Sequence, residues 1–146
     1  KVGIKMIKNK KVIILIVIFV CTSVALGILY YNETKKYSYT LNLPLDDSVY
    51  SINMEQDDKI VMIEEQEKIK DIMFIISKVK GTTTSKSVQD SPVNAENVIK
   101  INIEYNEGNI LTLFIYKKKN KYFIEQPYNG IYRISFDEYY SIEKYI

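Results

Sequence analysis

The sequence predicts an α+β fold that follows a single N-terminal transmembrane helix. Three observations lead to this fold class: an uncharged apolar run over residues 12–31, several short alternating segments typical of antiparallel strands, and two segments with helical spacing. After the apolar run, the predicted order of elements is β-β-α-loop-β-β-β-β-α. A small antiparallel sheet packed with one or two helices is the simplest architecture for that order.

Composition and charge exclude several classes of protein. The chain has 146 residues, no His and one Cys, Cys21. It therefore has no His-dependent catalytic triad, no His-ligated metal site and no intramolecular disulfide, and we expect no cofactor. Residues 1–32 carry five Lys and no acid, whereas residues 33–146 carry 15 Lys and Arg against 18 Asp and Glu. The folded part is thus not basic, which argues against a nucleic-acid partner.

The apolar run predicts a membrane anchor. Val12–Tyr31 has no charged residue over 20 positions, and about 20 helical residues span a hydrocarbon core of about 30 Å. The Lys residues before it predict a cytoplasmic N-terminus. We therefore expect a single-pass protein of the cell membrane, with lipid around Val12–Tyr31 and the rest of the chain outside the cell.

Two alternatives to an uncleaved anchor remain open. Ser23–Ala25 fits the small-x-small pattern of a signal-peptide cleavage site, and cleavage there would give a secreted protein. The apolar run continues through residues 26–29, where a cleavage region becomes polar, and this favours the anchor. Lipidation of Cys21 is a further alternative, but residues 18–20 are bulky.

These observations divide the chain into four parts. Residues 1–11 form a basic tail, 12–31 the anchor, 32–42 a polar stalk and 43–146 the extracytoplasmic α+β domain. About 105 residues are enough to build one hydrophobic core.

The first half of the domain predicts a hairpin and a helix. A strand over 48–54 places Tyr50, Ile52 and Met54 on one face, and a turn connects it to a second strand over 59–63. Apolar residues then recur with helical spacing over Glu64–Val79, and Gly81 is a natural stop. We expect this helix to bury the side chains of Ile69, Ile72, Met73, Ile76 and Val79.

The second half predicts an antiparallel meander and a last helix. Strands are expected over 99–105, 110–116, 121–126 and 131–135. The turn between the last two contains Asn129-Gly130, a strong hairpin signal because both residues tolerate positive φ. Ser135 and Glu138 fit a capping box that opens a helix over 136–145, with Tyr139 and Ile142 facing the core.

Two segments are candidates for a binding surface. Residues 81–97 form a 17-residue connection without predicted structure, and such loops are often functional. The turn over 126–130 carries one of the 13 Tyr residues, and Tyr offers a large amphipathic contact area at low entropic cost. The residues predicted to contact a partner are Thr84, Ser85, Lys86, Asp90, Gln126, Tyr128, Asn129 and Tyr132.

The same two segments carry a resemblance to a known family. Residues 84–92 (TSKSVQDSP) and 122–132 (YFIEQPYNGIY), with Leu43-Pro44 and the strand around Ile52, resemble a Firmicutes family of small membrane-anchored proteins with a domain of unknown function (5301-type). The resemblance covers roughly residues 43–146. It implies the envelope of a Gram-positive cell and adds no catalytic residue, because the family has no assigned activity.

Together these features favour a non-enzymatic binding module that recognises an envelope protein, a peptide or a cell-wall ligand. A self-protection (immunity-like) protein is a narrower form of this hypothesis. A small envelope hydrolase using carboxylates or Ser and Lys is the alternative, and converging Asp or Glu side chains in a deep pocket would favour it. In a third hypothesis the anchor itself is an interface, because Ser23 and Gly27 lie four residues apart on one helix face.

Overall fold

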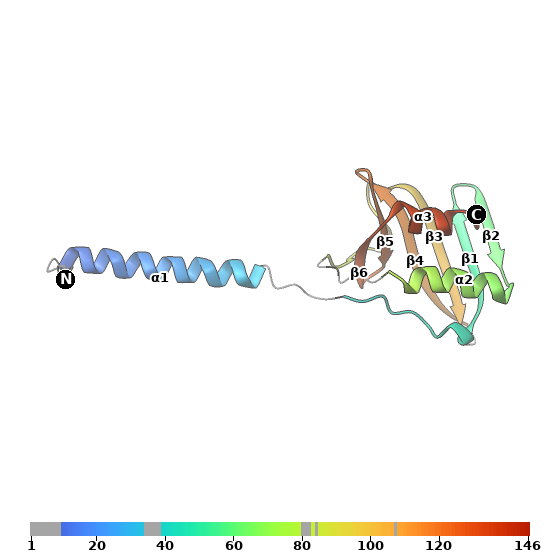
Figure 1. The fold of residues 1–146 in the computed structure, drawn as a ribbon, viewed down its shortest axis with the longest axis horizontal. Helices are drawn as coiled ribbons and strands as arrows, with labels where there is room; N and C mark the ends of the chain where they lie inside the picture. Colours follow the sequence, from blue (N-terminus) through green and yellow to red (C-terminus); the bar gives the residue numbers. More distant parts are fainter. Residues whose placement is uncertain (1–9, 34–38, 80–82, 84, 107) are drawn as a thin grey trace, which may run out of the picture. The chain divides into compact units, whose positions relative to one another are not determined.

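The computed structural model describes residues 10–33, 39–79, 83, 85–106 and 108–146 (Figure 1). Contacts within the chain divide it into two units, residues 1–36 and residues 37–146.

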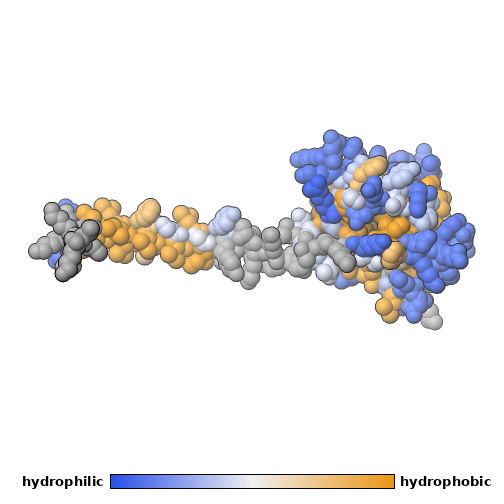
Figure 2. All heavy atoms as spheres, viewed as in Figure 1, coloured by the Kyte–Doolittle hydropathy of each residue, from blue (hydrophilic) through white to orange (hydrophobic). Residues whose placement is uncertain are grey.

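The first unit contains the helix α1, Lys10–Glu33. Its 21 residues Lys10–Tyr30 are long and apolar enough to cross a membrane, and the same features fit a signal sequence. Hydrophobic side chains cover most of its described surface (Figure 2). The hydroxyls of Thr22 and Ser23 both donate to the carbonyl oxygen of Phe19, at 2.9 and 2.7 Å. Polar groups satisfied within their own helix are compatible with an apolar solvent.

The second unit is an α+β fold, which confirms the fold class. Its six strands form one antiparallel sheet in the order β2-β1-β3-β4-β5-β6. Neighbouring strands follow one another along the chain except β1 and β3, between which lie β2, α2 and a long loop. The strands are β1 (Val49–Gln56), β2 (Lys59–Ile63), β3 (Glu96–Tyr105), β4 (Asn109–Lys118), β5 (Lys121–Gln126) and β6 (Gly130–Ile134), and the helices are η1 (Asp46–Ser48), α2 (Gln66–Ser77) and α3 (Phe136–Glu143).

The core lies between one face of the sheet and the helices α2 and α3, which cover the same face (Figure 1). Alternation along β3 sends Ile99, Ile101 and Ile103 into this core, where none of them is exposed to solvent. The helical stripe predicted from sequence is confirmed for its first four members, while Val79 lies beyond the end of α2 and is half-buried. Gly81, the predicted stop, is outside the described residues.

The last helix begins at its predicted capping box. The Glu138 backbone N–H donates to the hydroxyl oxygen of Ser135 at 3.2 Å, and the Ser135 backbone N–H donates to the Glu138 carboxylate at 2.6 Å. These bonds satisfy N–H groups that a helix start leaves without an intrahelical partner. Tyr139 and Ile142 face the core, as predicted.

One prediction for β1 was wrong. The pairing of β1 with β3 shifts between Val49 and Ser51, so Tyr50 lies in a bulge and its side chain is exposed. Val49 is buried instead, beside Ile52. A bulge inserts one extra residue and breaks the simple alternation on which the prediction depended.

Candidate functional site: the loop–turn surface

The two candidate segments lie side by side at one end of the sheet. Lys86 forms an isolated antiparallel bridge with Gly130. On either side of it, the Ser87 N–H donates to the Asn129 carbonyl at 3.3 Å and the Ile131 N–H donates to the Ser85 carbonyl at 3.0 Å. Residues 85–87 of the loop thus pair with the start of β6. We call residues 85–91 and 126–131 together the loop–turn surface.

Tyr128 is the most exposed aromatic side chain on this surface, at 62%. It occupies a turn closed by the Asn129 N–H, which donates to the Gln126 carbonyl at 3.0 Å. Pro127 precedes it, and the φ of Tyr128 is 60°. A type II turn has Pro at the first central position and positive φ at the second, where Gly is the usual residue. A Tyr there costs about 1 kcal/mol of backbone strain.

The turn therefore differs from the sequence prediction. Asn-Gly was expected to supply the positive φ values, yet neither Asn129 nor Gly130 has one. Pro127 fixes the first central position of the turn at negative φ, and this moves the left-handed residue to Tyr128. Asn129 instead contributes side-chain hydrogen bonds, and Gly130 allows a close approach because it has no side chain.

The Tyr128 hydroxyl joins the turn to the loop. It donates a hydrogen bond to the Asp90 carboxylate. That hydrogen bond, with the negative charge of Asp90, raises the pKa of Tyr128 above its usual value. This bond holds the ring beside the loop, in which the side chain of Val88 is also exposed. An oriented and exposed aromatic ring is a suitable contact for a partner.

A buried carboxylate lies beneath the loop. Glu125 is only 4% exposed and Ser87 only 1%. The Ser87 hydroxyl donates to one Glu125 oxygen at 2.6 Å, and the Tyr116 hydroxyl donates to the other at 2.9 Å. Burial raises the pKa of Tyr116, with further contributions from the hydrogen bond and the charge of Glu125. Because Ser87 is inaccessible, this cluster fixes the loop on the sheet and does not present a nucleophile.

Gln126 and Asn129 hold the segment that enters the domain. The Gln126 amide pairs with the Asn42 backbone: the Asn42 N–H donates to Oε1 at 2.9 Å, and Nε2 donates to the Asn42 carbonyl at 3.1 Å. The Asn129 Nδ2 donates to the Thr40 carbonyl and to Gln126 Oε1, both at 2.6 Å. Thr40 and Asn42, assigned by sequence to the stalk, are thus bonded to the folded domain.

Gly130 allows the turn to approach both the core and the loop. A Cβ at this position would lie 2.7 Å from the Tyr132 hydroxyl and 2.8 Å from Thr83 Cγ2. Tyr132 is buried and cannot move aside easily. We expect Gly130→Ala to lower the free energy of unfolding by about 1–3 kcal/mol, the usual cost of overpacking. Urea denaturation measures this, and Gly108→Ala does not serve as its control because Gly108 has φ of 106°.

A better control for that prediction is Ser85→Ala. Ser85 is exposed, and its contacts on the loop are made by backbone groups. If Gly130→Ala cost no more than Ser85→Ala, the close approach at Gly130 would be unimportant for stability.

Only some of the residues predicted to contact a partner are exposed on the loop–turn surface. Ser85, Lys86, Asp90 and Tyr128 are exposed on the loop–turn surface. Thr84 lies outside the described residues. Gln126 and Asn129 are used in holding the segment around Thr40, and Tyr132 is buried because alternation along β6 directs it to the helix side of the sheet.

Ser87 and Glu125 were not identified from sequence. Alternation puts Glu125 on the face opposite the buried Ile124, and no local pattern showed that the loop covers this face. Glu125 pairs with Phe114 on β4 and Ile131 on β6, two apolar residues. This pairing indicates a buried carboxylate only once the loop is known to cover it.

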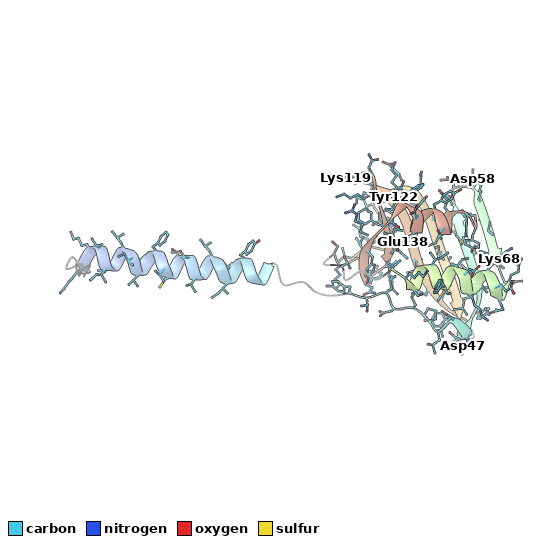
Figure 3. All side chains as sticks on the ribbon, viewed as in Figure 1. Asp47, Asp58, Lys68, Lys119, Tyr122 and Glu138 are labelled. Carbon is cyan, nitrogen blue, oxygen red and sulfur yellow. The ribbon has the colours of Figure 1, made fainter. Side chains whose placement is uncertain are left out.

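Away from this surface, Glu64, Glu65 and Asp71 are among the residues that line one pocket. No group of three or more His, Cys, Asp and Glu residues positioned to hold a metal ion occurs among the described residues. Asp47 on η1 and Asp58 in the β1–β2 turn lie at opposite ends of the sheet (Figure 3). The loop–turn surface itself is held by hydrogen bonds, and Tyr128 is an exposed aromatic residue oriented on it.

Comparison with known proteins places the chain in a family. The DUF5301 family model, described as a domain of unknown function (DUF5300), matches residues 37–133. No curated protein and no solved structure matches the chain significantly. The matched region covers more than half of the chain and includes both halves of the loop–turn surface. The chain is therefore a member of the DUF5301 family of domains of unknown function.

Proposed function

We propose that this protein is a membrane-anchored, extracytoplasmic binding module of the cell envelope, and that the loop–turn surface contacts its partner. The observation that carries the proposal is Tyr128, an exposed aromatic residue held at φ 60° and oriented by Asp90. Backbone strain of this kind is retained where the surrounding structure enforces it, and it gathers at functional sites. A Gly or Asn would fill the same turn with less strain.

The proposed partner is an envelope protein, a peptide or a cell-wall component. Tyr128 would contribute buried aromatic area, and the exposed Lys86 and Ser85 would contribute polar contacts at the rim. Because the bonds below the surface are already formed in the free protein, little conformational entropy is lost on binding. The apolar helix α1, kept uncleaved, would hold the module at the membrane with its basic N-terminus in the cytoplasm.

The test compares two tyrosines of similar exposure. Tyr128 is 62% exposed on the loop–turn surface, and Tyr140 is 56% exposed on α3. The full-length protein, Tyr128→Ala and Tyr140→Ala are each crosslinked in cells of the source organism and recovered from the membrane. We expect one discrete partner with the parent protein and Tyr140→Ala, and a loss of about tenfold or more with Tyr128→Ala, as for an aromatic hot spot.

Folding must be measured on the same variants. Tyr128→Ala removes a surface hydrogen bond and does not create a core cavity, so its free energy of unfolding should change by less than about 1 kcal/mol. A partner that binds both variants equally would refute the role of the turn. A large loss of stability in Tyr128→Ala would show that the residue is structural.

A further inference from the structure

The two edges of the sheet differ in how they are protected. At β6, the loop pairs with the strand through Lys86 and Ser85. At the opposite edge, β2 pairs only with β1 among the described strands. Its Ile60 and Met62 are 69% and 59% exposed. Charge, proline or a bulge normally shields an edge with free backbone groups and exposed apolar side chains, and β2 carries only one of these, the charge of Lys59 at its start.

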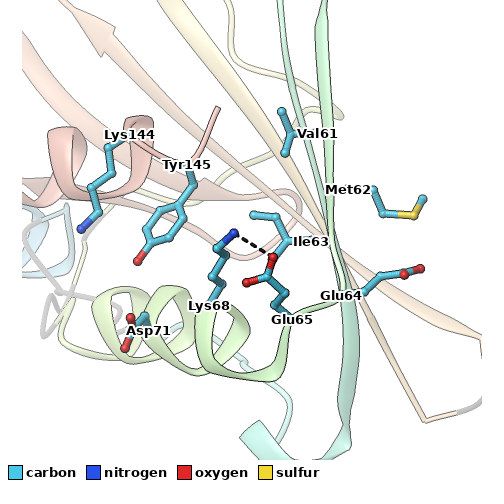
Figure 4. A pocket seen from close by; sticks show the side chains of 9 residues that line it. All are labelled: Val61, Met62, Ile63, Glu64, Glu65, Lys68, Asp71, Lys144 and Tyr145. Atoms are coloured by element: carbon cyan, nitrogen blue, oxygen red, sulfur yellow. Dashed lines mark hydrogen bonds and ion pairs between the residues drawn. The ribbon is translucent and has the colours of Figure 1, made fainter.

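A pocket lies directly beside this edge. It has a volume of about 560 Å³ and is formed by β2, the start of α2 and the end of α3 (Figure 4). Val61 and Ile63 line it from the strand, and Tyr145 lines it from the C-terminal segment. These three side chains give it an apolar wall. The volume is within the range of about 300–1,000 Å³ that is usual for ligand sites.

The polar part of the pocket is acidic overall. Five charged side chains line it: three carboxylates and two ammonium groups. Lys68 and Glu65 neutralise each other in an ion pair of 2.9 Å. Glu64 and Asp71 then outnumber Lys144, and neither carboxylate has a hydrogen bond or ion pair with another described residue. The Lys144 ammonium lies 5.0 Å from the ring centre of Tyr145, so this ring face already accepts a cation.

We propose that the free edge of β2 binds an extended peptide by strand addition, and that a lysine-like side chain of this peptide enters the pocket. Added strands use backbone hydrogen bonds for affinity and side-chain pockets for specificity. Alternate residues of such a peptide point to opposite faces. On the helix side, the aliphatic stem of a lysine would lie on Val61 and Tyr145, with its ammonium near Asp71. On the other side, apolar residues would cover Ile60 and Met62.

The charges around the pocket favour a lysine-containing peptide over an anionic ligand and over a second copy of the chain. An anionic ligand would meet the excess of carboxylates. A second copy of the chain pairing β2 with β2 in antiparallel fashion around Val61 would bring Asp58 of one copy opposite Glu64 of the other. Like charges directly opposite each other on neighbouring strands are unfavourable. This surface is distinct from the loop–turn surface, and the inference does not depend on the proposed function.

The experiment uses a synthetic heptapeptide with acetylated and amidated ends. Valine occupies its odd positions, threonine its second and sixth positions, and lysine its fourth. Binding to the full-length protein in detergent micelles is measured by fluorescence anisotropy. The first control peptide has glutamate in place of lysine. The second control is a pair of lysine peptides, one N-methylated on the odd amides and the other on the even amides. Methylation of the amides that face β2 blocks backbone pairing with this strand. We expect saturable binding of the lysine peptide only.

Variants of the protein locate the site. Glu64→Gln with Asp71→Asn should weaken binding of the lysine peptide by roughly tenfold. The matched control is Glu67→Gln with Asp137→Asn, two exposed carboxylates in helix first turns outside the pocket. This control and Tyr128→Ala should leave the affinity unchanged.

Three results would overturn the inference. They are equal binding of the lysine and glutamate peptides, equal binding of the methylated peptides, and an affinity that the Glu64 and Asp71 changes do not alter. Absence of binding, accompanied by concentration-dependent dimerisation that Ile60→Lys abolishes, would assign the edge to a second copy instead. Loss of binding in Tyr128→Ala would show that the peptide lies on the loop–turn surface.

Discussion

Replacing Glu125 by Ala is expected to lower the free energy of unfolding by about 3 kcal/mol. The change removes the acceptor shared by the hydroxyls of Ser87 and Tyr116, and both hydroxyls are buried. Each buried donor left unsatisfied costs about 1–3 kcal/mol, and the lost side-chain volume adds to this. Urea denaturation measures the total. Hydrogen exchange should locate the loss at the Ser87 amide, whose bond to the Asn129 carbonyl depends on the loop staying in place.

Two control variants test whether the loss of stability comes from the buried carboxylate of Glu125. Glu125→Gln keeps the shape and one acceptor oxygen, so it should cost only about 1 kcal/mol. Glu104→Ala changes a half-exposed carboxylate on β3 and should cost less than about 0.5 kcal/mol. If Glu125→Ala were no more destabilising than Glu104→Ala, the buried cluster would not be what fixes the loop.

The proposed anchoring role of α1 predicts that two arginines in its middle prevent membrane insertion. Val20 and Val24 lie four residues apart on the helix and have exposed side chains. Each Arg at the centre of a spanning helix costs about 2.5–3.5 kcal/mol of insertion free energy, so Val20→Arg with Val24→Arg costs about 5–7 kcal/mol. Membrane fractionation at high pH, followed by intact mass, measures the outcome. The parent protein should stay in the membrane with α1 attached.

The control for the anchor is Val20→Leu with Val24→Leu, which keeps the segment apolar and should remain in the membrane. A parent protein recovered without residues before position 26 would contradict the anchor and favour a cleaved signal peptide.

Local signals were sufficient for most of the fold. The bounds of β2 and β5 and the Ser135 capping box could be predicted because each depends on neighbours in sequence: alternation, turn residues and a cap. Tyr50 could not be placed correctly, because its bulge arises from the pairing of β1 with β3, about 50 residues further along the chain. Alternation alone does not indicate where a strand carries an extra residue.

The candidate surface was predictable in outline only. Loop length and turn composition pointed to the segments around Asp90 and Tyr128, which the structure brings into contact. Their internal roles were not predictable, because they depend on contacts between distant residues. Gln126 binds the Asn42 backbone 84 positions away, and Ser87 reaches Glu125 across 38 positions. The positive φ of Tyr128 arises from the competition between Pro127 and the Asn-Gly signal within one turn.

The most direct test of the proposed function is site-specific photocrosslinking in cells. A photoreactive phenylalanine analogue is placed at position 128 in one strain and at position 140 in another, because both positions are exposed and tolerate an aromatic ring. Our account predicts one discrete crosslinked product from position 128 that is absent from position 140. The same product from both positions, or no product from position 128 in a folded and membrane-bound protein, would contradict it.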